Sequence, residues 1–424
     1  MTASTDDEQE LIIERVAALD IGKATLVVCV RIPHERVARR RVKETRTYAT
    51  TTNALLSLRD FLLCQGVTRV VMEATGDYWR APFYLLEDTF ETWLLNAAHV
   101  KNLPGRPKTD RLDAEWLARC AERQMVRPSF VPPKPIRRLR DLTRYRSALV
   151  QDRTREKQRL EKILEDAQIK LDVVVSDLHG LSGRAMLEAL IAGERNPHAL
   201  ADLAKARLRG KMPQLVEALT GNFTDHHAYL CRSMLANIDR LTEQADQLSA
   251  RIEAELAAFA GDAIERLDEI VGIGPRAAQV IIAEIGLDMT RFPTPAHLAS
   301  WAKLAPITRE SAGKNKRATT GKGNSYLAAI LGEAVIGASR TPTRIAERYR
   351  RLSRRIGKRR AIVAVSRTLL TIIWQLLSDP AARFDDLGPD FYDLRADPQR
   401  RTRNLIRELE RLGHNVILEP VPKP

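Results

Sequence analysis

The stretch ERVAALDIGKATLVVCVRI, residues 14–32, decides the fold class of this chain. It contains two short apolar runs, 14–22 and 25–32, in which β-branched residues are frequent. A tight turn at Gly22 and Lys23 joins them, and this pattern is typical of a β-hairpin. The chain therefore begins its folded part with two antiparallel strands.

The residues that follow alternate between helical and extended patterns. Residues 52–66 have helical spacing and end at Gly66, whereas 67–74 and 92–97 are short apolar runs that predict strands. A Gly/Pro loop at 102–109 precedes a predicted helix from Asp110 to Gln124. Strands that alternate with helices in this way predict an α/β layer architecture.

Composition excludes several classes of protein. The chain has 424 residues, of which 44% are hydrophobic and 29% charged, so a soluble protein of two or three domains is expected. Its four cysteines are scattered without a CxxC pair, which argues against a disulfide scaffold, a zinc ribbon or an iron–sulfur site. The acidic residues 1–10 do not resemble a signal peptide. The apolar run 361–377 contains Arg367 and is short for a membrane span, so it predicts a buried helix in a cytoplasmic protein that makes no membrane contact.

The net charge of +14 is concentrated in two stretches of the chain. Residues 127–170 hold 13 Lys/Arg and 6 Asp/Glu, and residues 340–360 hold 10 and 1, so the remainder is slightly acidic. Two such stretches indicate a polyanionic partner, most often a nucleic acid, although solvated helix faces are the alternative. Within the second stretch, one helical stripe of arginines is a plausible contact face for a nucleic-acid backbone: Arg344, Arg348, Arg351 and Arg355.

Proline and heptad patterns divide the chain into four parts. The sequence RPSFVPPKP, 127–135, contains four prolines and predicts a linker. Apolar residues then follow 4-3 spacing between 228 and 260, broken at Glu255, which predicts either a coiled-coil hairpin or a helix through which copies of the chain associate. The predicted parts are an α/β domain, 11–126; a coiled-coil region with an insertion of small helices, 136–260; a mostly helical domain, 262–375; and a C-terminal tail, 376–424.

Four carboxylates of the α/β domain form the first candidate site. Asp20 and Glu73 end predicted strands, and Asp110 and Asp113 share one face at the start of a predicted helix. Sites in open α/β sheets lie at the carboxyl ends of strands, so these side chains are expected to converge and to bind one or two Mg²⁺ ions. Two such ions can stabilise the attacking and leaving oxygens of a phosphoryl transfer. The alternative is that Asp110 and Asp113 only stabilise a helix start, Glu73 is a polar strand end beside the Gly76 turn, and Asp20 is an Asx-turn residue before Gly22.

A helix-hairpin-helix pattern opens the predicted helical domain. In IERLDEIVGIGPRAAQVIIAEIG, 264–286, Gly272 and Gly274 permit a tight turn and Pro275 suits the first position of the second helix. Such a hairpin offers free backbone N–H groups to a phosphate without reading bases. An ordinary helical hairpin in a core is the alternative.

A polar loop follows a helix that ends in WAKLAP and precedes a helix that begins near Asn324. Ser311 in this loop is a candidate nucleophile toward a phosphodiester, and nearby cations can stabilise the developing charge. A serine hydroxyl needs a base or a metal to activate it, and no histidine has a suitable spacing here. A solvated loop that contacts phosphates without chemistry is the alternative. The cations expected to contact nucleic acid are Lys314, Lys316, Arg317 and Lys322.

Taken together, these motifs resemble the DEDD transposases of the insertion-sequence 110 family, the bridge-RNA-guided recombinases. The resemblance covers roughly residues 14–370 and rests on LDIGK, VMEATGDYW, KTDRLDA, IVGIGPRAAQVIIAEIG and SAGKNKRATTGKGN in that order. It differs where Ala312 follows the serine, because the family commonly has Gly there. The resemblance implies a RuvC-like (RNase H fold) N-terminal domain and a C-terminal transposase domain.

The resemblance also implies a chemistry and a set of partners. Asp20, Glu73, Asp110 and Asp113 would coordinate Mg²⁺, and Ser311 would form a covalent link to a DNA phosphate. A bridge RNA would select the DNA by base pairing, and a homo-oligomer, dimer or tetramer, would combine acids and serine from different protomers in the bacterial cytosol or nucleoid. Three other hypotheses remain open: a metal-dependent RuvC-like nuclease or junction resolvase without a covalent intermediate, a non-catalytic nucleic-acid-binding oligomer, and, least favoured, an actin-like sugar kinase.

Overall fold

The computed structural model describes residues 12–37, 40–74, 76–101, 105, 109–311, 314–395 and 397–419, and for 307–311 and 314–319 the backbone alone. The acidic start of the chain, most of the loop 102–109 and Ala312 lie outside these residues. The chain divides into two compact units, Met1–Val131 and Pro132–Pro424, and the division falls in the proline-rich stretch.

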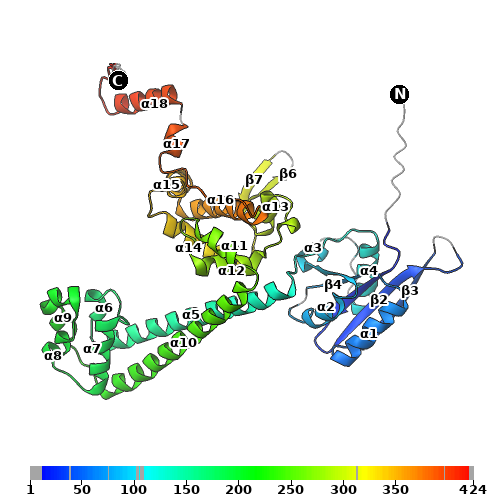
Figure 1. Ribbon diagram of the computed structural model, residues 1–424, viewed down its shortest axis with the longest axis horizontal. Helices are drawn as coiled ribbons and strands as arrows, with labels where there is room; N and C mark the ends of the chain where they lie inside the picture. Colours follow the sequence, from blue (N-terminus) through cyan, green and yellow to red (C-terminus); the bar gives the residue numbers. More distant parts are fainter. Residues whose placement is uncertain are drawn as a thin grey trace. The chain divides into compact units, whose positions relative to one another are not determined.

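The first unit is a five-stranded mixed sheet with helices on both faces (Figure 1). The strand order is β3-β2-β1-β4-β5, in which β1–β2 and β2–β3 are antiparallel while β1–β4 and β4–β5 are parallel. The predicted α/β class is confirmed, and the arrangement is compatible with a RuvC-like domain. The elements are β1 (Val16–Ile21), β2 (Thr25–Pro33), β3 (Arg41–Ala49), α1 (Thr52–Cys64), β4 (Arg69–Glu73), α2 (Arg80–Leu86), β5 (Glu91–Leu95), α3 (Ala97–Lys101) and α4 (Asp110–Glu122).

Alternation along the central strands gives the sheet two buried faces. Ala17, Leu19 and Met72 belong to the apolar cluster that includes residues of α1 and α2. Ala18 and Val71 belong to a second cluster, which includes six apolar residues of α4 and one of α3. Successive side chains of a strand point to opposite faces of the sheet. The position of a residue in this alternation therefore determines whether it packs against α1 and α2 or against α3 and α4.

Sequence analysis missed β3 and α2. The strand RVKETRTYA is an edge strand rich in charged residues. It contains too few apolar residues for an alternating apolar and polar pattern to predict a strand. Charged side chains on an edge strand also discourage pairing with another chain. Helix α2 has only 7 residues, too few for a helical period to stand out in the sequence.

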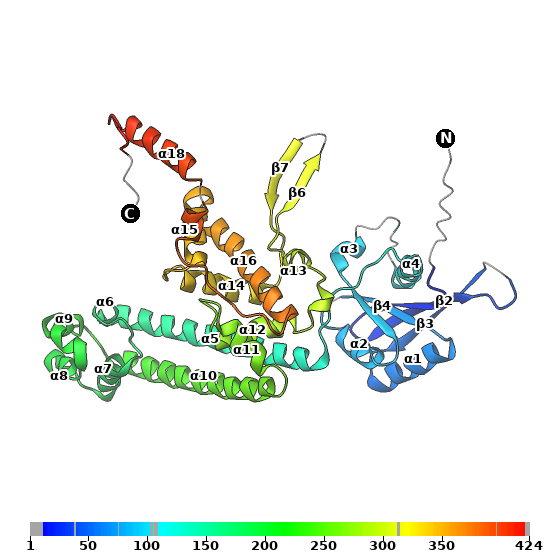
Figure 2. The same cartoon turned by 45° about the horizontal axis from the view of Figure 1, so that its top comes forward.

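Two long helices of the second unit form an antiparallel hairpin, α5 (Lys134–Asp166) with α10 (Asp225–Ala257) (Figure 2). The direction follows from three side-chain contacts: Arg146 Nη1 to Ser249 Oγ at 3.4 Å, Arg153 Nη1 to Thr242 Oγ1 at 3.3 Å, and Asp166 Oδ2 to His227 Nε2 at 3.0 Å. The heptad residues Leu241 and Ala245 pack against Leu149 of α5. Of the two predicted alternatives, the hairpin within one chain is therefore observed, and the predicted self-association remains untested.

The insertion between these helices closes the far end of the hairpin. Its apolar residues form a cluster with Leu160 and Leu164 of α5 and with Cys231 and Leu235 of α10. The insertion consists of small helices, as predicted: α6 (Leu171–Val174), α7 (Leu181–Ala192), α8 (Pro197–Asp202), the 3₁₀ turn η1 (Ala206–Lys211) and α9 (Met212–Ala218).

The predicted helical domain has α16 as its central helix. Val365, Leu369 and Ile373 of α16 are fully buried, and α11, α13, α14 and α15 pack against this helix. Among the described residues, α16 alone passes the length and hydropathy test for a membrane span, but its apolar side chains fill the core of the domain. The helices are α11 (Gly261–Asp268), α12 (Pro275–Ile285), the 3₁₀ turn η2 (Met289–Arg291), α13 (Pro295–Trp301), α14 (Ser325–Ala338), α15 (Arg344–Ile356) and α16 (Lys358–Ser378).

The region between α13 and α14 corrects the sequence analysis, which expected an irregular loop. It is a β-hairpin of β6 (Ile307–Ser311) and β7 (Lys314–Thr319) that stands out from the helices of its unit (Figure 2). Backbone pairing between the strands allows a ribbon to form without an apolar face, so polar composition alone did not reveal it. Beyond α16, the chain forms α17 (Phe391–Leu394) and α18 (Pro398–Arg411).

The turn between α11 and α12 provides a stability test. Gly272 has φ +94°, and a Cβ atom there would clash with the carbonyl oxygen of Ala334 in α14. Gly274 has φ −92° and nothing within 4 Å of its added Cβ position. We expect Gly272→Ala to lower the free energy of unfolding by about 2–3 kcal/mol, because it combines left-handed strain with a backbone clash.

Gly274→Ala is the matched control, with an expected cost below about 1 kcal/mol at this helix N-cap. Urea denaturation of the two variants measures both values. Equal destabilisation would show that α12 and α14 do not require the close approach at Gly272.

Candidate active site

Asp20 and Glu73 occupy neighbouring positions at the carboxyl ends of two adjacent parallel strands. The last pair recorded in the β1–β4 register is Leu19 with Met72, and Asp20 and Glu73 each come one residue later. Asp20 lies two residues after Ala18, and Glu73 lies two residues after Val71. Because side chains two residues apart in a strand point to the same face, both acids belong to the face that α4 covers. Glu73 is only 9% exposed, a burial that a carboxylate rarely tolerates without a partner.

Helix α4 brings the other two acids to this face. Its first turn contains Asp110 and Asp113, and Thr109 rather than Asp110 is its N-cap residue. Negative charges in the first turn stabilise a helix through its dipole. The alternative, that Asp110 and Asp113 only stabilise the helix start, is therefore also compatible with this geometry. Sequence spacing alone could not show that α4 packs against β1.

Ion pairs with the antiparallel strands fix the orientation of α4. Glu122, near its end, is 4% exposed and pairs with Arg31 at 2.7 Å and with Arg41. Glu115 accepts a hydrogen bond from Lys43 at 2.5 Å, and this bond holds the pKa of the Glu115 carboxyl below its usual value. Both acids therefore serve to attach α4 to the sheet.

The four acids have the donor chemistry of a magnesium site. Carboxylate oxygens are the hard ligands that Mg²⁺ prefers, usually together with water and substrate phosphates. Within the described part of the chain, however, no group of three or more His, Cys, Asp or Glu side chains lies close enough to hold a metal ion. The structure thus places the strand-end acids beneath α4 without showing a formed metal centre.

Cysteine does not offer a competing nucleophile in the cores. Burial raises the pKa of Cys29, Cys120 and Cys231, the last to about 11, so these thiols stay protonated near neutral pH. A protonated, buried thiol is inert toward electrophiles.

Ser311 is the last residue of β6 and pairs in register with Lys314, the first residue of β7. Arg309 pairs with Lys316 two positions further from the turn. The candidate serine therefore lies at the closed end of a ribbon whose two strands contain several cationic residues. Lys322, beyond β7, is exposed, and Arg317 lies within β7.

A buried acid that sequence analysis missed joins the base of this ribbon to the coiled-coil hairpin. Glu284 of α12 is fully buried, and both of its oxygens accept hydrogen bonds from Arg144 of α5 at 2.8 Å. Its Oε2 also accepts a hydrogen bond from Asn324, whose own side chain caps α14. Arg140 donates to the backbone oxygens of Ala283 and Glu284. The sequence does contain a sign of this site: Glu284 stands inside the apolar run VIIAEI. An acid that is buried with such a run needs a cationic partner.

The basic stretches are only partly available to a partner. Arg146 of α5 is 6% exposed and donates to Gln279 at 2.7 Å, so part of the first stretch holds α12 in place. On α15, Arg351 and Arg355 are exposed, whereas Arg344 and Arg348 are half-buried. The hairpin glycines Gly272 and Gly274 are both exposed at the turn before α12.

Comparison with known proteins identifies the family. A model of the DEDD transposases of IS110 matches residues 17–169, and a model described as transposase IS116/IS110/IS902 family matches residues 264–350. The two matches cover more than half of the chain and include the four candidate carboxylates and Ser311.

Three relatives agree with these models. The chain is 28% identical to an uncharacterized 43.6 kDa protein of insertion element IS110 from Streptomyces coelicolor over 49% of this chain and 55% of the relative, so that match spans about half of the relative's length. It is 25% identical to the transposase for insertion sequence element IS1111A from Coxiella burnetii, over 73% and 77% of the two chains. It is 27% identical to an uncharacterized 42 kDa protein of insertion element IS900 from Mycobacterium paratuberculosis, over 65% and 73%. The chain therefore belongs to the IS110 family of insertion-sequence transposases.

Proposed function

We propose that this protein is a DNA transposase or recombinase that cuts and rejoins DNA through a covalent phosphoserine at Ser311, with Mg²⁺ held by Asp20, Glu73, Asp110 and Asp113. The observation that carries the proposal is the neighbouring position of Asp20 and Glu73 at the ends of two parallel strands, on the face covered by the helix that contains the other two acids. Carboxylates from three separate elements supply the oxygen ligands that a catalytic cation prefers, and sites in such sheets lie at the carboxyl ends of the strands.

The residues have distinct roles in this mechanism. Mg²⁺, when bound, would neutralise charge on the phosphate and lower the pKa of a coordinated hydroxyl. The Ser311 hydroxyl gives up its proton to water, and its oxygen attacks the phosphorus. An Oγ–P bond forms as the P–O bond to the departing DNA strand breaks, and that strand leaves as a hydroxyl after taking a proton from water. Attack by a different DNA hydroxyl on the phosphoserine reverses these bond changes and joins new ends, which conserves the bond energy.

Cationic residues around Ser311 hold the substrate and stabilise the reaction. Lys314 lies opposite Ser311 in the ribbon, and Lys316, Arg317 and Lys322 follow it in sequence. Their positive charge favours the extra negative charge that develops on the phosphate oxygens. The turn before α12 offers backbone N–H groups near Gly274 to the DNA backbone.

The charge of the chain supports a nucleic-acid partner, because exposed arginines of α5 and α15 suit phosphates without reading sequence. The resemblance to the family implies the rest: a bridge RNA supplies the sequence specificity through base pairing with DNA. A dimer or tetramer of the chain assembles the acids and the serine of one active site, in the cytoplasm where the DNA lies.

Trapping of the covalent intermediate tests the proposal. Purified protein is incubated with its RNA and with DNA that carries an element end, with Mg²⁺ or with EDTA, and denatured before electrophoresis. We expect a DNA–protein adduct that requires Mg²⁺, whose phosphopeptide maps to Ser311 by mass spectrometry. Cut DNA without an adduct would instead support a metal-dependent nuclease, and DNA binding without any cut would support a non-catalytic role.

A further inference from the structure

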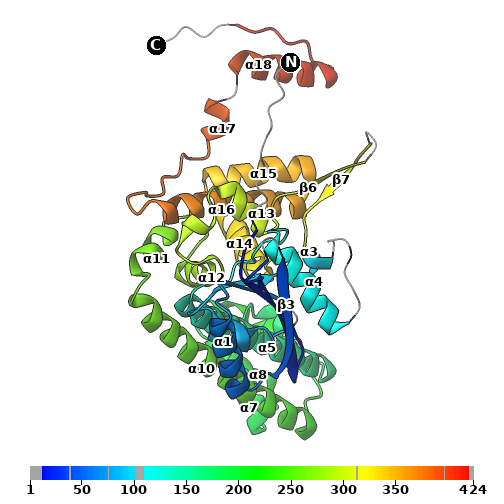
Figure 3. The ribbon, with the colours of Figure 1, turned by 90° about the vertical axis from the view of Figure 1, so that its right-hand side faces the viewer.

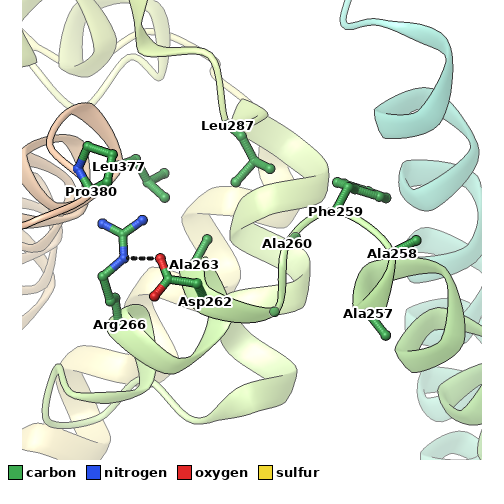
Figure 4. Close-up of a pocket in the computed structure, with 11 residues that line it drawn as sticks. Ala257, Ala258, Phe259, Ala260, Asp262, Ala263, Arg266, Leu287, Leu377 and Pro380 are labelled. Carbon is green, nitrogen blue, oxygen red and sulfur yellow. Dashed lines mark hydrogen bonds and ion pairs between the residues drawn. The ribbon is translucent and has the colours of Figure 1, made fainter.

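Residues 379–395, which we name the strap, leave the end of α16 and pass along the domain to α17 (Figure 3). They begin at a cavity of about 490 Å³ between the end of α10, α11 and the end of α16 (Figure 4). Arg266 of α11 lies at this cavity and donates from Nη1 to the carbonyl oxygens of Leu376 and Asp379, while its Nε donates to Asp262 at 2.8 Å. The root of the strap is therefore attached to α11.

Polar contacts attach the next part of the strap to the same helix. The backbone N–H of Phe384 donates to Glu269 at 2.9 Å, and Arg383 lies 3.8 Å from both Asp262 and Glu269. This path leads the strap from α11 toward α15.

The distal part of the strap contacts the arginine stripe of α15. Asp386 accepts a hydrogen bond from the backbone N–H of Arg344 at 3.0 Å, and the Arg344 guanidinium lies 5.3 Å from the ring centre of Phe391. Arg348 donates to the Tyr392 hydroxyl at 3.3 Å, and the Arg351 guanidinium lies 4.9 Å from the ring centre of Tyr392. Three of the four stripe arginines thus contact the strap.

The strap offers these arginines the same chemistry as a nucleic acid. The strap is acidic, as a phosphate backbone is, and its aromatic rings attract the guanidinium cations as stacked bases would. Between 379 and 395 the sequence has five aspartates and two arginines, in contrast to the strongly basic 340–360. Charge complementarity therefore favours the covered state when no polyanion is present.

The cover leaves polar atoms of the interface unsatisfied. Among the described residues, the Nε atoms of Arg344 and Arg348 and Oδ2 of Asp386 are buried without a hydrogen-bond partner. A buried donor or acceptor without a partner lowers the stability of the state that buries it. Phosphate oxygens could accept from both Nε atoms, so a nucleic-acid backbone is a better partner for this stripe than the strap.

We infer that the strap is an autoinhibitory cover that competes with the phosphodiester backbone of a nucleic acid for Arg344, Arg348 and Arg351. The inference rests on the proposed nucleic-acid-binding function and adds a regulated surface to it. Binding to this surface requires an open strap, so the apparent affinity falls by the fraction of molecules that are open.

The test compares the full-length protein with the variant Phe391→Ala/Tyr392→Ala. Binding of a 30-base-pair duplex DNA and of an RNA hairpin of equal charge is measured by fluorescence anisotropy at several salt concentrations. We expect the variant to bind at least one of them about tenfold more tightly. The affinity of the variant should also fall more steeply with salt concentration. The increase in the slope of log affinity against log salt should correspond to about two to three additional phosphate contacts. The two probes distinguish DNA from RNA as the ligand of the stripe.

Two further variants separate uncovering from nonspecific effects. Leu394→Ala alters an exposed side chain of the same helix, 83% accessible, and should bind as wild type does. Adding Arg348→Gln and Arg351→Gln to the double variant should abolish its gain, while circular dichroism reports whether each variant is folded.

The outcomes also distinguish this inference from the proposed function. If wild type and the folded strap variant bind both probes equally, or if the gain survives loss of the arginines, the autoinhibitory role is wrong while nucleic-acid binding stands. If neither protein binds either probe, both proposals are overturned. Hydrogen exchange at 386–394 that accelerates when the preferred probe binds to wild type would support displacement of the strap.

Discussion

Asp20→Asn is expected to reduce magnesium-dependent DNA cutting by at least about a thousandfold while the protein remains folded. The substitution keeps the size of the side chain and removes the charge that a hard cation requires. Asp20 lies beside Glu73 at the sheet edge, so the loss should also weaken cation binding. The measurements are the single-turnover cutting rate at saturating Mg²⁺ and the increase in melting temperature that Mg²⁺ causes, which should be smaller in the variant.

Asp60→Asn is the matched control for this substitution. Asp60 belongs to α1 on the opposite face of the sheet, is 63% exposed and pairs only with its neighbour Arg59 among the ion pairs described. Its loss should leave cutting and the magnesium-induced stabilisation unchanged. A variant Asp20→Asn that cuts DNA at the wild-type rate would remove Asp20 from the active site and favour its alternative role as an Asx-turn residue before Gly22.

Glu284→Ala is expected to lower the free energy of unfolding by about 3–5 kcal/mol. The substitution leaves Arg144, whose pKa the hydrogen bond to Glu284 raises, without its bidentate partner in a half-buried position. It also removes the acceptor of Asn324, the residue that caps α14. Chemical denaturation monitored by tryptophan fluorescence measures the loss, because Trp301 and Trp374 belong to the affected domain.

Two control variants show whether the charge or the shape of Glu284 matters. Glu284→Gln retains the shape and one acceptor, so we expect a smaller loss, about 1–3 kcal/mol. Glu243→Ala removes an exposed acid of α10 and should change stability by less than about 0.5 kcal/mol. If Glu284→Ala is as stable as Glu243→Ala, the buried network does not hold the domain to the coiled-coil hairpin.

This network has a consequence for catalysis under the proposed mechanism. Asn324 begins the helix that directly follows the ribbon of Ser311, and Glu284 attaches that residue to α5. The position of the serine ribbon therefore depends on the coiled-coil hairpin as well as on its own domain. A structural displacement of the hairpin would be transmitted to the base of the ribbon through packed side chains.

The sequence predicted the regular elements best where local periodicity is strong. The β1–β2 hairpin, α1 with its end near Gly66, and α4 were all expected from spacing and turn residues. The long helix α10 followed from its heptad pattern. In contrast, β3 and the β6–β7 ribbon were not predicted. Polar strands are stabilised by backbone pairing with a neighbouring strand, and local sequence does not show which strand that is.

By itself, the sequence determined which side chains have the chemistry for a nucleic-acid reaction: four carboxylates near predicted strand and helix ends, a serine among cations, and two basic stretches. Only the tertiary structure decided which of them meet. The β1–β4 register made Asp20 and Glu73 neighbours, and packing of α4 added its first turn to the same face. Folding also turned Arg144 inward to Glu284 and placed Phe391 and Tyr392 over Arg344 and Arg351. The physical reason is that residue type and period are local properties, whereas register, burial and charge pairing depend on residues far apart in the chain.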